Sequence, residues 1–120
     1  MVDDIKMKPQ FTYRASLIRV IDGDTVEARI DLGFDVWTVR TIRFYGIDAW
    51  ESRTRDLEEK AKGLQAKAFV QAAMGRCGGE FVLVSHGVGK YGRCLGTIYI
   101  ESADLNQQLL QEGLAVEYRP

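Results

Sequence analysis

Residues 20–31, VIDGDTVEARID, combine the strongest hairpin signal of the chain with its most regular strand pattern. The dipeptide Asp22-Gly23 is typical of the tight turn of a β-hairpin. After this turn, apolar and polar residues alternate over residues 25–31, which predicts a strand with one buried face. The residues predicted on that face are Val26, Ala28 and Ile30. Residues 13–21, rich in apolar and β-forming side chains, are predicted to be the strand before the turn.

A second turn follows, and residues 36–45 are predicted to be a third strand, so the first part of the chain reads as a three-stranded meander. The spacing of apolar residues then changes. Over residues 57–72 they recur every three or four positions, which predicts a helix. The residues on its apolar face are Leu57, Ala61, Leu64, Ala68 and Ala72. Gly63 lies inside this helix, at a cost of about 1 kcal/mol relative to alanine.

The C-terminal part is predicted to hold two more strands, at residues 80–85 and 93–100, and a short helix closed by Gly113. Five strands with a helix between the third and the fourth fit the five-stranded OB barrel, which binds oligonucleotides on one face. We therefore predict an α+β, mainly β fold: a five-stranded OB-fold barrel with a helix between strands 3 and 4 and a short C-terminal helix. The length of 120 residues predicts one domain.

The net charge of −1 and the pI near 5.8 argue weakly against a nucleic-acid binder, although carboxylates that bind a metal contribute to that sum. No apolar run approaches the ~20 residues of a membrane span, so no membrane partner is expected. The first ten residues lack the apolar segment of a secretory signal, so a cytoplasmic location is expected unless a signal has been removed. Cys77 and Cys94 are predicted to be free thiols.

Three acidic residues lie at the ends of the predicted strands. Asp24 follows the first turn, Asp48 ends the third strand, and Glu51 comes three positions later. In a meander, the start of the second strand lies beside the end of the third, so Asp24 and Asp48 can share one hard cation such as Ca²⁺ or Mg²⁺. In the alternative interpretation, Asp22 and Asp24 are ordinary turn residues and Asp48 only ends a strand. Spacing alone favours this alternative.

Two arginines accompany these acids. Arg43 precedes Asp48 by five positions, and Arg93 follows the glycine-rich loop. Guanidinium groups bind phosphate oxygens through paired hydrogen bonds, so two of them beside a cation suit phosphoryl transfer. For either arginine taken alone, the alternative of a solvated strand residue is favoured. We expect Arg43 and Glu51 at a polar site mouth, where their substitution changes the reaction rate far more than stability.

The loop at residues 87–92, GVGKYG, matches the spacing of a dinucleotide-binding fingerprint. That fingerprint must open a helix, whereas the following RCLGTIYI has the character of a strand. We interpret the loop as one that brings Lys90, Tyr91 and Arg93 to a substrate. Tyr91 and Tyr118 can stack on nucleobases, as aromatic side chains do in proteins that bind single strands.

Four segments of the chain, in their order and spacing, resemble the staphylococcal nuclease, or thermonuclease, family. They are VIDGDTV at 20–26, IRFYGIDAWE at 42–51, KYGRCLGTIYI at 90–100 and LLQEGLA at 109–115. Members of this family are OB barrels with flanking helices and are typically Ca²⁺-dependent nucleases. The resemblance implies that residues 1–120 form a single staphylococcal-nuclease-like OB-fold domain, with its core at about 13–118.

The resemblance also implies a role for individual residues. Asp24 and Asp48 match the calcium-binding carboxylates, and Ala49 stands where a main-chain carbonyl binds the ion. Glu51 matches the general base that acts on the attacking water. The phosphate-binding arginines are matched by Arg43 and Arg93. The residues near nucleotide-contacting positions are Lys90, Tyr91 and Tyr118. Trp50 replaces a proline that the family commonly has, so the turn that aims Glu51 is expected to be looser or to be held by packing.

These roles predict a calcium-dependent endonuclease, a metal-dependent phosphodiesterase that hydrolyses DNA, preferably single-stranded, with RNA as a further candidate substrate. The resemblance implies products that end in 3′-phosphate and 5′-hydroxyl, and a monomeric protein is expected. The alternative is a non-catalytic OB-fold module that binds nucleic acid or a protein partner. The presence of all three acids and both arginines argues against this alternative.

Overall fold

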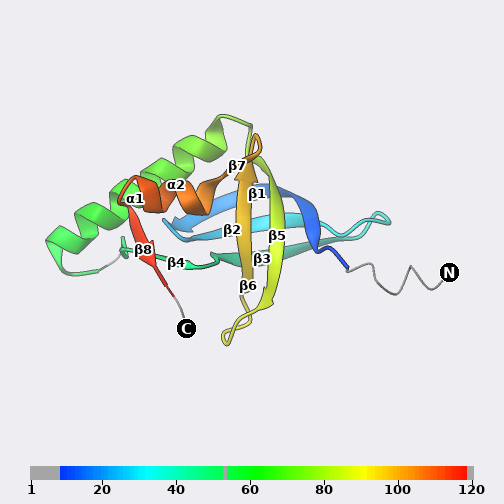
Figure 1. Ribbon diagram of the computed structural model, residues 1–120, viewed down its shortest axis with the longest axis horizontal. Helices are drawn as coiled ribbons and strands as arrows, with labels where there is room; N and C mark the ends of the chain where they lie inside the picture. The colour runs from blue at the N-terminus through cyan, green and yellow to red at the C-terminus, as the bar shows by residue number, and fades with distance from the viewer. Residues whose placement is uncertain (1–8, 53, 119–120) are drawn as a thin grey trace.

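Five strands curl into a closed barrel in the computed structural model, which describes residues 9–52 and 54–118 (Figure 1). The barrel strands are β1 (Thr12–Asp22), β2 (Thr25–Asp31), β3 (Trp37–Phe44), β5 (Glu80–Val88) and β6 (Cys94–Ile100). They are hydrogen-bonded in the order β3-β2-β1-β5-β6, and a parallel pairing of β3 with β6 closes the ring. The predicted OB-fold barrel is therefore confirmed.

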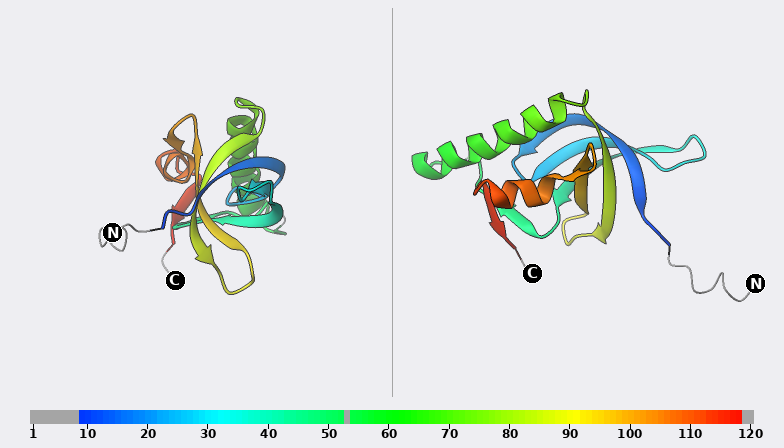
Figure 2. Two further views of the ribbon diagram at one scale, coloured as in Figure 1. Left: turned by 90° about the vertical axis from the view of Figure 1, so that its right-hand side faces the viewer. Right: turned by 45° about the horizontal axis from the view of Figure 1, so that its top comes forward.

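Two helices and three short strands complete the described part of the chain. They are β4 (Ile47–Ala49), α1 (Leu57–Gly75), β7 (Ala103–Asp104), α2 (Leu105–Gln111) and β8 (Ala115–Glu117). Figures 1 and 2 show that the β2–β3 hairpin extends away from the end of the molecule at which β4 and β8 pair. Within residues 9–52 and 54–118, neither helix has the length and apolar character that crossing a bilayer requires.

The core of the barrel is built from the alternating face that the sequence predicted on β2. Val26 and Ala28 are fully buried, and Ile30 is 3% exposed. The turn before this strand lies one residue later than predicted. Asp22 pairs with Thr25, so the turn is Gly23-Asp24 and not Asp22-Gly23. The two cysteines are free thiols, as predicted.

The helix α1 is confirmed, but the prediction of its buried face is wrong. The predicted apolar face is exposed along its whole length, and Leu57 alone is 81% exposed. The buried residues of α1 are Gly63, Ala66, Val70, Ala73 and Met74. The first two residues of this stripe, Gly63 and Ala66, are small because the helix lies close to other parts of the chain there. A Cβ on Gly23 would lie 2.4 Å from the Cβ of Ala66, so the glycine of the first turn is required by this contact.

Gly63 lies where α1 contacts the segment that follows β4. A Cβ at this position would lie 2.4 Å from the carbonyl oxygen of Glu51 and 2.6 Å from the amide nitrogen of Ser52. These are backbone atoms, which cannot turn aside as a flexible side chain can. Ser52 is also anchored to the first turn, because its amide and its Oγ donate hydrogen bonds of 3.3 and 2.6 Å to Asp22 Oδ1. The helix and the first turn together fix the backbone that carries Glu51.

Replacement of Gly63 by alanine tests this contact. Helix propensity alone would make Gly63→Ala more stable by about 1 kcal/mol. We expect a lower free energy of unfolding instead, by about 1–3 kcal/mol, because the methyl group overpacks the Glu51–Ser52 backbone. The measurement is urea denaturation. The control is Gly75→Ala at the end of the same helix, where an added Cβ meets no atom within 4 Å. If both variants gain stability equally, the contact does not constrain α1.

Candidate active site

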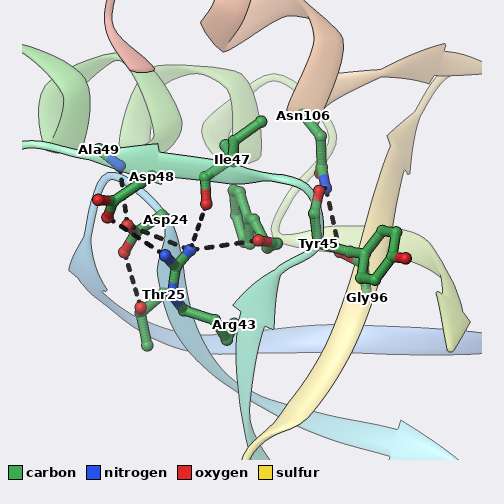
Figure 3. Close-up of polar contacts among 10 residues, drawn as sticks. Asp24, Thr25, Arg43, Tyr45, Ile47, Asp48, Ala49, Gly96 and Asn106 are labelled. Carbon is green, nitrogen blue, oxygen red and sulfur yellow. Dashed lines mark hydrogen bonds and ion pairs between the residues drawn. The ribbon is translucent and has the colours of Figure 1, made fainter. Parts of the chain in front are cut away.

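A cluster of charged side chains forms where the first turn meets the end of β3. Arg43 pairs with Thr25 in the β2–β3 register, which brings Asp24 beside β3 as the meander predicted. Arg43 Nη1 lies 3.2 Å from Asp24 Oδ2, and Nη2 lies 3.2 Å from Asp48 Oδ1. Figure 3 shows dashed contacts from the guanidinium group to both carboxylates. The two acids that the sequence paired are therefore joined through one arginine.

Asp24 is buried and surrounded by hydrogen-bond donors. Thr25 Oγ1 donates to Oδ1 at 2.8 Å, and the Ala49 amide donates to Oδ2 at 2.9 Å. Burial nevertheless raises the pKa of Asp24 above its usual value, although Arg43 and these two hydrogen bonds oppose the shift and nearby Asp48 adds to it. The fold thus holds this carboxylate in a place where its negative charge needs cationic partners.

Arg43 does not lie at an exposed site mouth, so that prediction is wrong. Only 15% of its side chain is exposed. Nη1 donates to the carbonyls of Ile47 at 2.8 Å and Phe44 at 3.2 Å, in addition to its contact with Asp24. A guanidinium group has five N–H donors. Nε of Arg43 donates no hydrogen bond to a described residue. Part of the donor capacity of Arg43 is therefore not used by the described residues.

One edge of β4 faces this cluster. The carbonyl of Ile47 accepts from Arg43 and the amide of Ala49 donates to Asp24, so both residues direct backbone groups away from β8. In an antiparallel pair, a residue exchanges either both backbone hydrogen bonds with its partner or neither. The carbonyl of Ala49 consequently lies on the same edge as its amide, the edge that faces Asp24. Oxygen atoms of this kind are the ligands that hard cations prefer.

Among residues 9–52 and 54–118, no group of three or more histidine, cysteine, aspartate or glutamate side chains could hold a metal ion. The acidic side chains that meet at the cluster are Asp24 and Asp48. A cation there would depend on these two carboxylates, on the backbone oxygen of Ala49 and on water.

A cavity of about 520 Å³ opens beside the cluster and brings together residues from distant parts of the chain. The predicted site residues that line it are Arg43, Asp48, Lys90, Tyr91, Arg93 and Tyr118. Cation–π contacts order its walls: the Arg43 guanidinium carbon lies 5.9 Å from the ring centroid of Tyr118, and that of Arg93 lies 5.6 Å from Tyr91. A larger hollow of about 910 Å³ elsewhere is lined by none of the predicted site residues.

Glu51 stands apart from the other predicted residues. Its side chain is exposed, it does not line the cavity, and within the described residues nothing forms a hydrogen bond or ion pair with its carboxylate. Its backbone, however, is held by packing rather than by a proline. Beside the Gly63 contact, Lys62 Nζ lies 4.9 Å from the ring centroid of Trp50. Of the two expectations for this turn, packing is the one that the structure supports.

Sequence reasoning missed Asn106, a buried residue of α2. Its Oδ1 accepts from the amide of Ile98, and its Nδ2 donates to the carbonyls of Tyr45 at 3.0 Å and Gly96 at 3.1 Å (Figure 3). Asn106 thereby fixes the connection between β3 and β4, which separates Arg43 from Ile47. The available signal was an asparagine next to Leu105 inside an otherwise apolar helix face.

The barrel, its flanking helices and the carboxylate–guanidinium cluster define a class of OB-fold protein, and sequence comparison gives the family. The family model described as staphylococcal nuclease homologue matches residues 41–120, and the chain belongs to this family. It is 31% identical over 116 residues to the protein ParB of Escherichia coli, an alignment that covers 88% of this chain and 58% of that protein. It is 28% identical over 116 residues to the micrococcal nuclease of Shigella flexneri, with 89% and 59% covered. The chain thus spans less than two thirds of the length of these relatives.

Removal of Arg43 should destabilise the fold. Arg43→Ala leaves the buried Asp24 carboxylate without its cationic partner, and loss of one member of a buried pair costs about 3–5 kcal/mol. Because the folded pKa of Asp24 is already raised, its ionisation removes stability as the pH rises through that pKa. Without Arg43 the pKa rises further. The difference between wild type and variant should therefore be large near pH 7 and shrink as the pH is lowered and the carboxyl group becomes protonated.

The measurement is urea denaturation of both proteins across this pH range. Arg93→Ala is the matched control, since Arg93 is only partly buried and forms no ion pair with a described carboxylate. It should unfold like the wild type at every pH. An Arg43→Ala penalty that is the same at both ends of the range would show that Asp24 is not the cause.

Proposed function

We propose that the chain is a metal-dependent nuclease that hydrolyses phosphodiester bonds of DNA, preferably single-stranded, with RNA as a further candidate substrate. The observation that carries this proposal is the Arg43 guanidinium, paired with two carboxylates at the wall of a cavity that Arg93 also lines. Membership of the staphylococcal nuclease family supports it, as does similarity to a relative whose name is micrococcal nuclease. The protein would act as a single OB-fold domain and as a monomer.

Calcium is the cofactor that the donor set suits. Asp24, Asp48 and the Ala49 carbonyl would bind it through oxygen, and Asp48 Oδ2 accepts no hydrogen bond from a described residue. Ca²⁺ takes six to eight oxygen ligands, so water would supply the remainder and the affinity would be low, on the order of 10⁻⁴–10⁻³ M. When bound, the ion would polarise the phosphate and offset its negative charge.

The residues of the cavity would bind and orient the phosphate. Arg43 would donate its remaining N–H groups to phosphate oxygens, and Arg93 would approach from another wall of the same cavity. Donors fixed in advance stabilise the charge that develops on these oxygens in the transition state. Lys90 would contact a neighbouring phosphate, and Tyr91 and Tyr118 would stack on the base.

Glu51 would position or deprotonate the attacking water. Its backbone is fixed by Gly63 and Ser52 while its carboxylate is exposed, so rotation of the side chain is the movement that this role requires. Attack in line with the 5′ oxygen would leave a 3′-phosphate and a 5′-hydroxyl, the products that the family resemblance implies.

A second candidate is a non-catalytic module that binds nucleic acid through the same cavity. It is favoured by the position of Glu51, which does not line the cavity, and by the ion pairs that Arg43 forms with both aspartates. Such a module would bind single strands in a salt-dependent way and would cleave nothing when calcium is added.

Cleavage kinetics separate the two candidates. Single-stranded DNA should be cut in calcium and not in chelator. Glu51→Gln should lower the initial rate about 10²–10⁴-fold, the usual contribution of a general base. Arg93→Ala should lower it about 10²–10³-fold. Both side chains are partly or fully exposed, so both variants should melt like the wild type.

Glu112→Gln is the matched control for Glu51→Gln, because it removes an exposed carboxylate at the end of α2. It should cleave at the wild-type rate. A wild-type protein that cuts no more than its chelator control would support the binding module. A Glu51→Gln variant with the wild-type rate would remove Glu51 from the mechanism.

Calcium binding tests the metal ligands directly. Asp24→Asn removes one of two anionic ligands and should weaken calcium at least about tenfold, because ligand charge sets affinity in such sites. Since the pKa of Asp24 is raised, protons should also displace calcium at a higher pH than an ordinary aspartate would give. Titration calorimetry measures both effects. Asp31→Asn, on the β2–β3 hairpin, is the control, and equal calcium affinity in the two variants would exclude Asp24 as a ligand.

A further inference from the structure

Two exposed aromatic rings stack on each other beside the candidate active site. The ring centroids of Tyr45 and His86 lie 4.1 Å apart, with an angle of 13° between the planes. Tyr45 is 47% exposed, and His86, the only histidine of the chain, is exposed as well. Neither residue has a part in the binding of the phosphate or the metal described above.

We propose that the Tyr45–His86 pair is a stacking platform for a second nucleobase, next to the nucleotide that occupies the 520 Å³ cavity. This inference rests on the proposed function, because it assumes that a single nucleic-acid strand is the ligand of that cavity. It extends the site from one nucleotide to a single-stranded segment.

The position of Tyr45 supports the proposal. Tyr45 follows Arg43 by two residues and lines the active-site cavity, and it also lines a second hollow of about 580 Å³. The two hollows share the residues of the β3–β4 connection and Tyr118. Tyr45 therefore stands at the boundary between them. A strand with one phosphate at Arg43 that continues into the second hollow must pass this ring.

Polar contacts to β6 and α2 hold the backbone of Tyr45 and the ring of His86. The Tyr45 amide donates to the carbonyl of Gly96 at 2.8 Å, and the Tyr45 carbonyl accepts from Asn106. His86 Nε2 lies 2.8 Å from Thr97 Oγ1. A platform whose backbone is anchored and whose rings already stack on each other loses less conformational entropy when a base stacks on it.

The path of β5 also directs His86 towards Tyr45. The register between β5 and β6 shifts between Ser85 and Val88, which is the irregularity of a β-bulge. Bulges re-aim side chains and occur often beside active sites. His86 lies within this bulge and is followed by Gly87, whose φ of 110° is unfavourable for residues with a side chain. The backbone therefore departs from regular pairing at the point where His86 meets Tyr45.

The side chains around the Tyr45–His86 pair suit a nucleotide within a strand. The cavity beside Tyr45 is lined by Arg43, Lys90 and Arg93, which suit phosphate groups. An exposed aromatic face next to basic side chains fits a flat group that carries phosphate on either side, which is a nucleotide within a strand. Every base has a π-face, so the platform should accept all four bases.

Base deletion tests the platform. We would measure the binding of labelled single-stranded DNA in calcium by fluorescence anisotropy, in the Glu51→Gln background to suppress cleavage. An abasic site would be moved along the strand, one position at a time. In the otherwise unaltered protein, removal of the base that reaches the platform should weaken binding about tenfold, as is typical for one stacked base. In Tyr45→Leu and in His86→Ala, the same deletion should have no further effect.

The comparison separates a binding role from a structural one. Tyr45→Leu keeps an apolar side chain, and His86→Ala provides the test if Tyr45→Leu does not fold. Phe34→Ala, on the distant β2–β3 hairpin, removes another exposed aromatic ring and should retain the full abasic effect. Lower stability with an unchanged abasic effect would mean that the pair only packs, and would overturn the platform.

The outcomes also distinguish this inference from the proposed function. If wild-type protein cleaves DNA but the abasic effect is equal in all variants, the platform is wrong and the nuclease assignment stands. If the ring variants abolish the abasic effect but wild-type protein cleaves nothing, the platform stands on a binding module. If no strand binds, both proposals are wrong.

Discussion

The buried carboxylate of Asp24, paired with Arg43, connects the first turn of the barrel with two later strands. Asp24 lies in the turn between β1 and β2, Arg43 is on β3, and the same Asp24 carboxylate accepts from the amide of Ala49 on β4. A buried carboxylate is stable only with such partners, so the geometry of turn, barrel strand and β4 edge is coupled. The site is therefore assembled by the same contacts that stabilise this end of the barrel.

Close backbone contact is the second constraint, and it explains where sequence reasoning failed. The predicted face of α1 was chosen by hydrophobicity, yet Leu57 and Leu64 are exposed and the buried stripe begins with Gly63 and Ala66. A helix that touches the backbone of Glu51 has no room for leucine, and hydrophobic patterning carries no information about that distance. Gly63, which lowers helix propensity, is the residue that permits the contact.

The remaining predictions succeeded or failed according to how local their causes are. The strand at residues 25–31 follows from alternation within a few residues, and the approach of Asp24 to β3 follows from a simple meander. The pairing of β4 with β8 joins three-residue strands that are distant in sequence and show no period. The burial of Arg43 depends on the carbonyls of Phe44 and Ile47, and backbone acceptors are invisible in a sequence.

The acidic composition of the chain agrees with a nucleic-acid ligand once individual charges are placed. Asp24 and Asp48 both contact Arg43, so part of the negative charge is neutralised inside the cluster. Lys90 and Arg93 line the cavity, and within the described residues neither forms an ion pair with a carboxylate. A phosphate that enters the cavity therefore meets two cations, Lys90 and Arg93, that no described carboxylate pairs with. Since charges further away than about 8–10 Å are screened at physiological salt, these few side chains outweigh the total of −1.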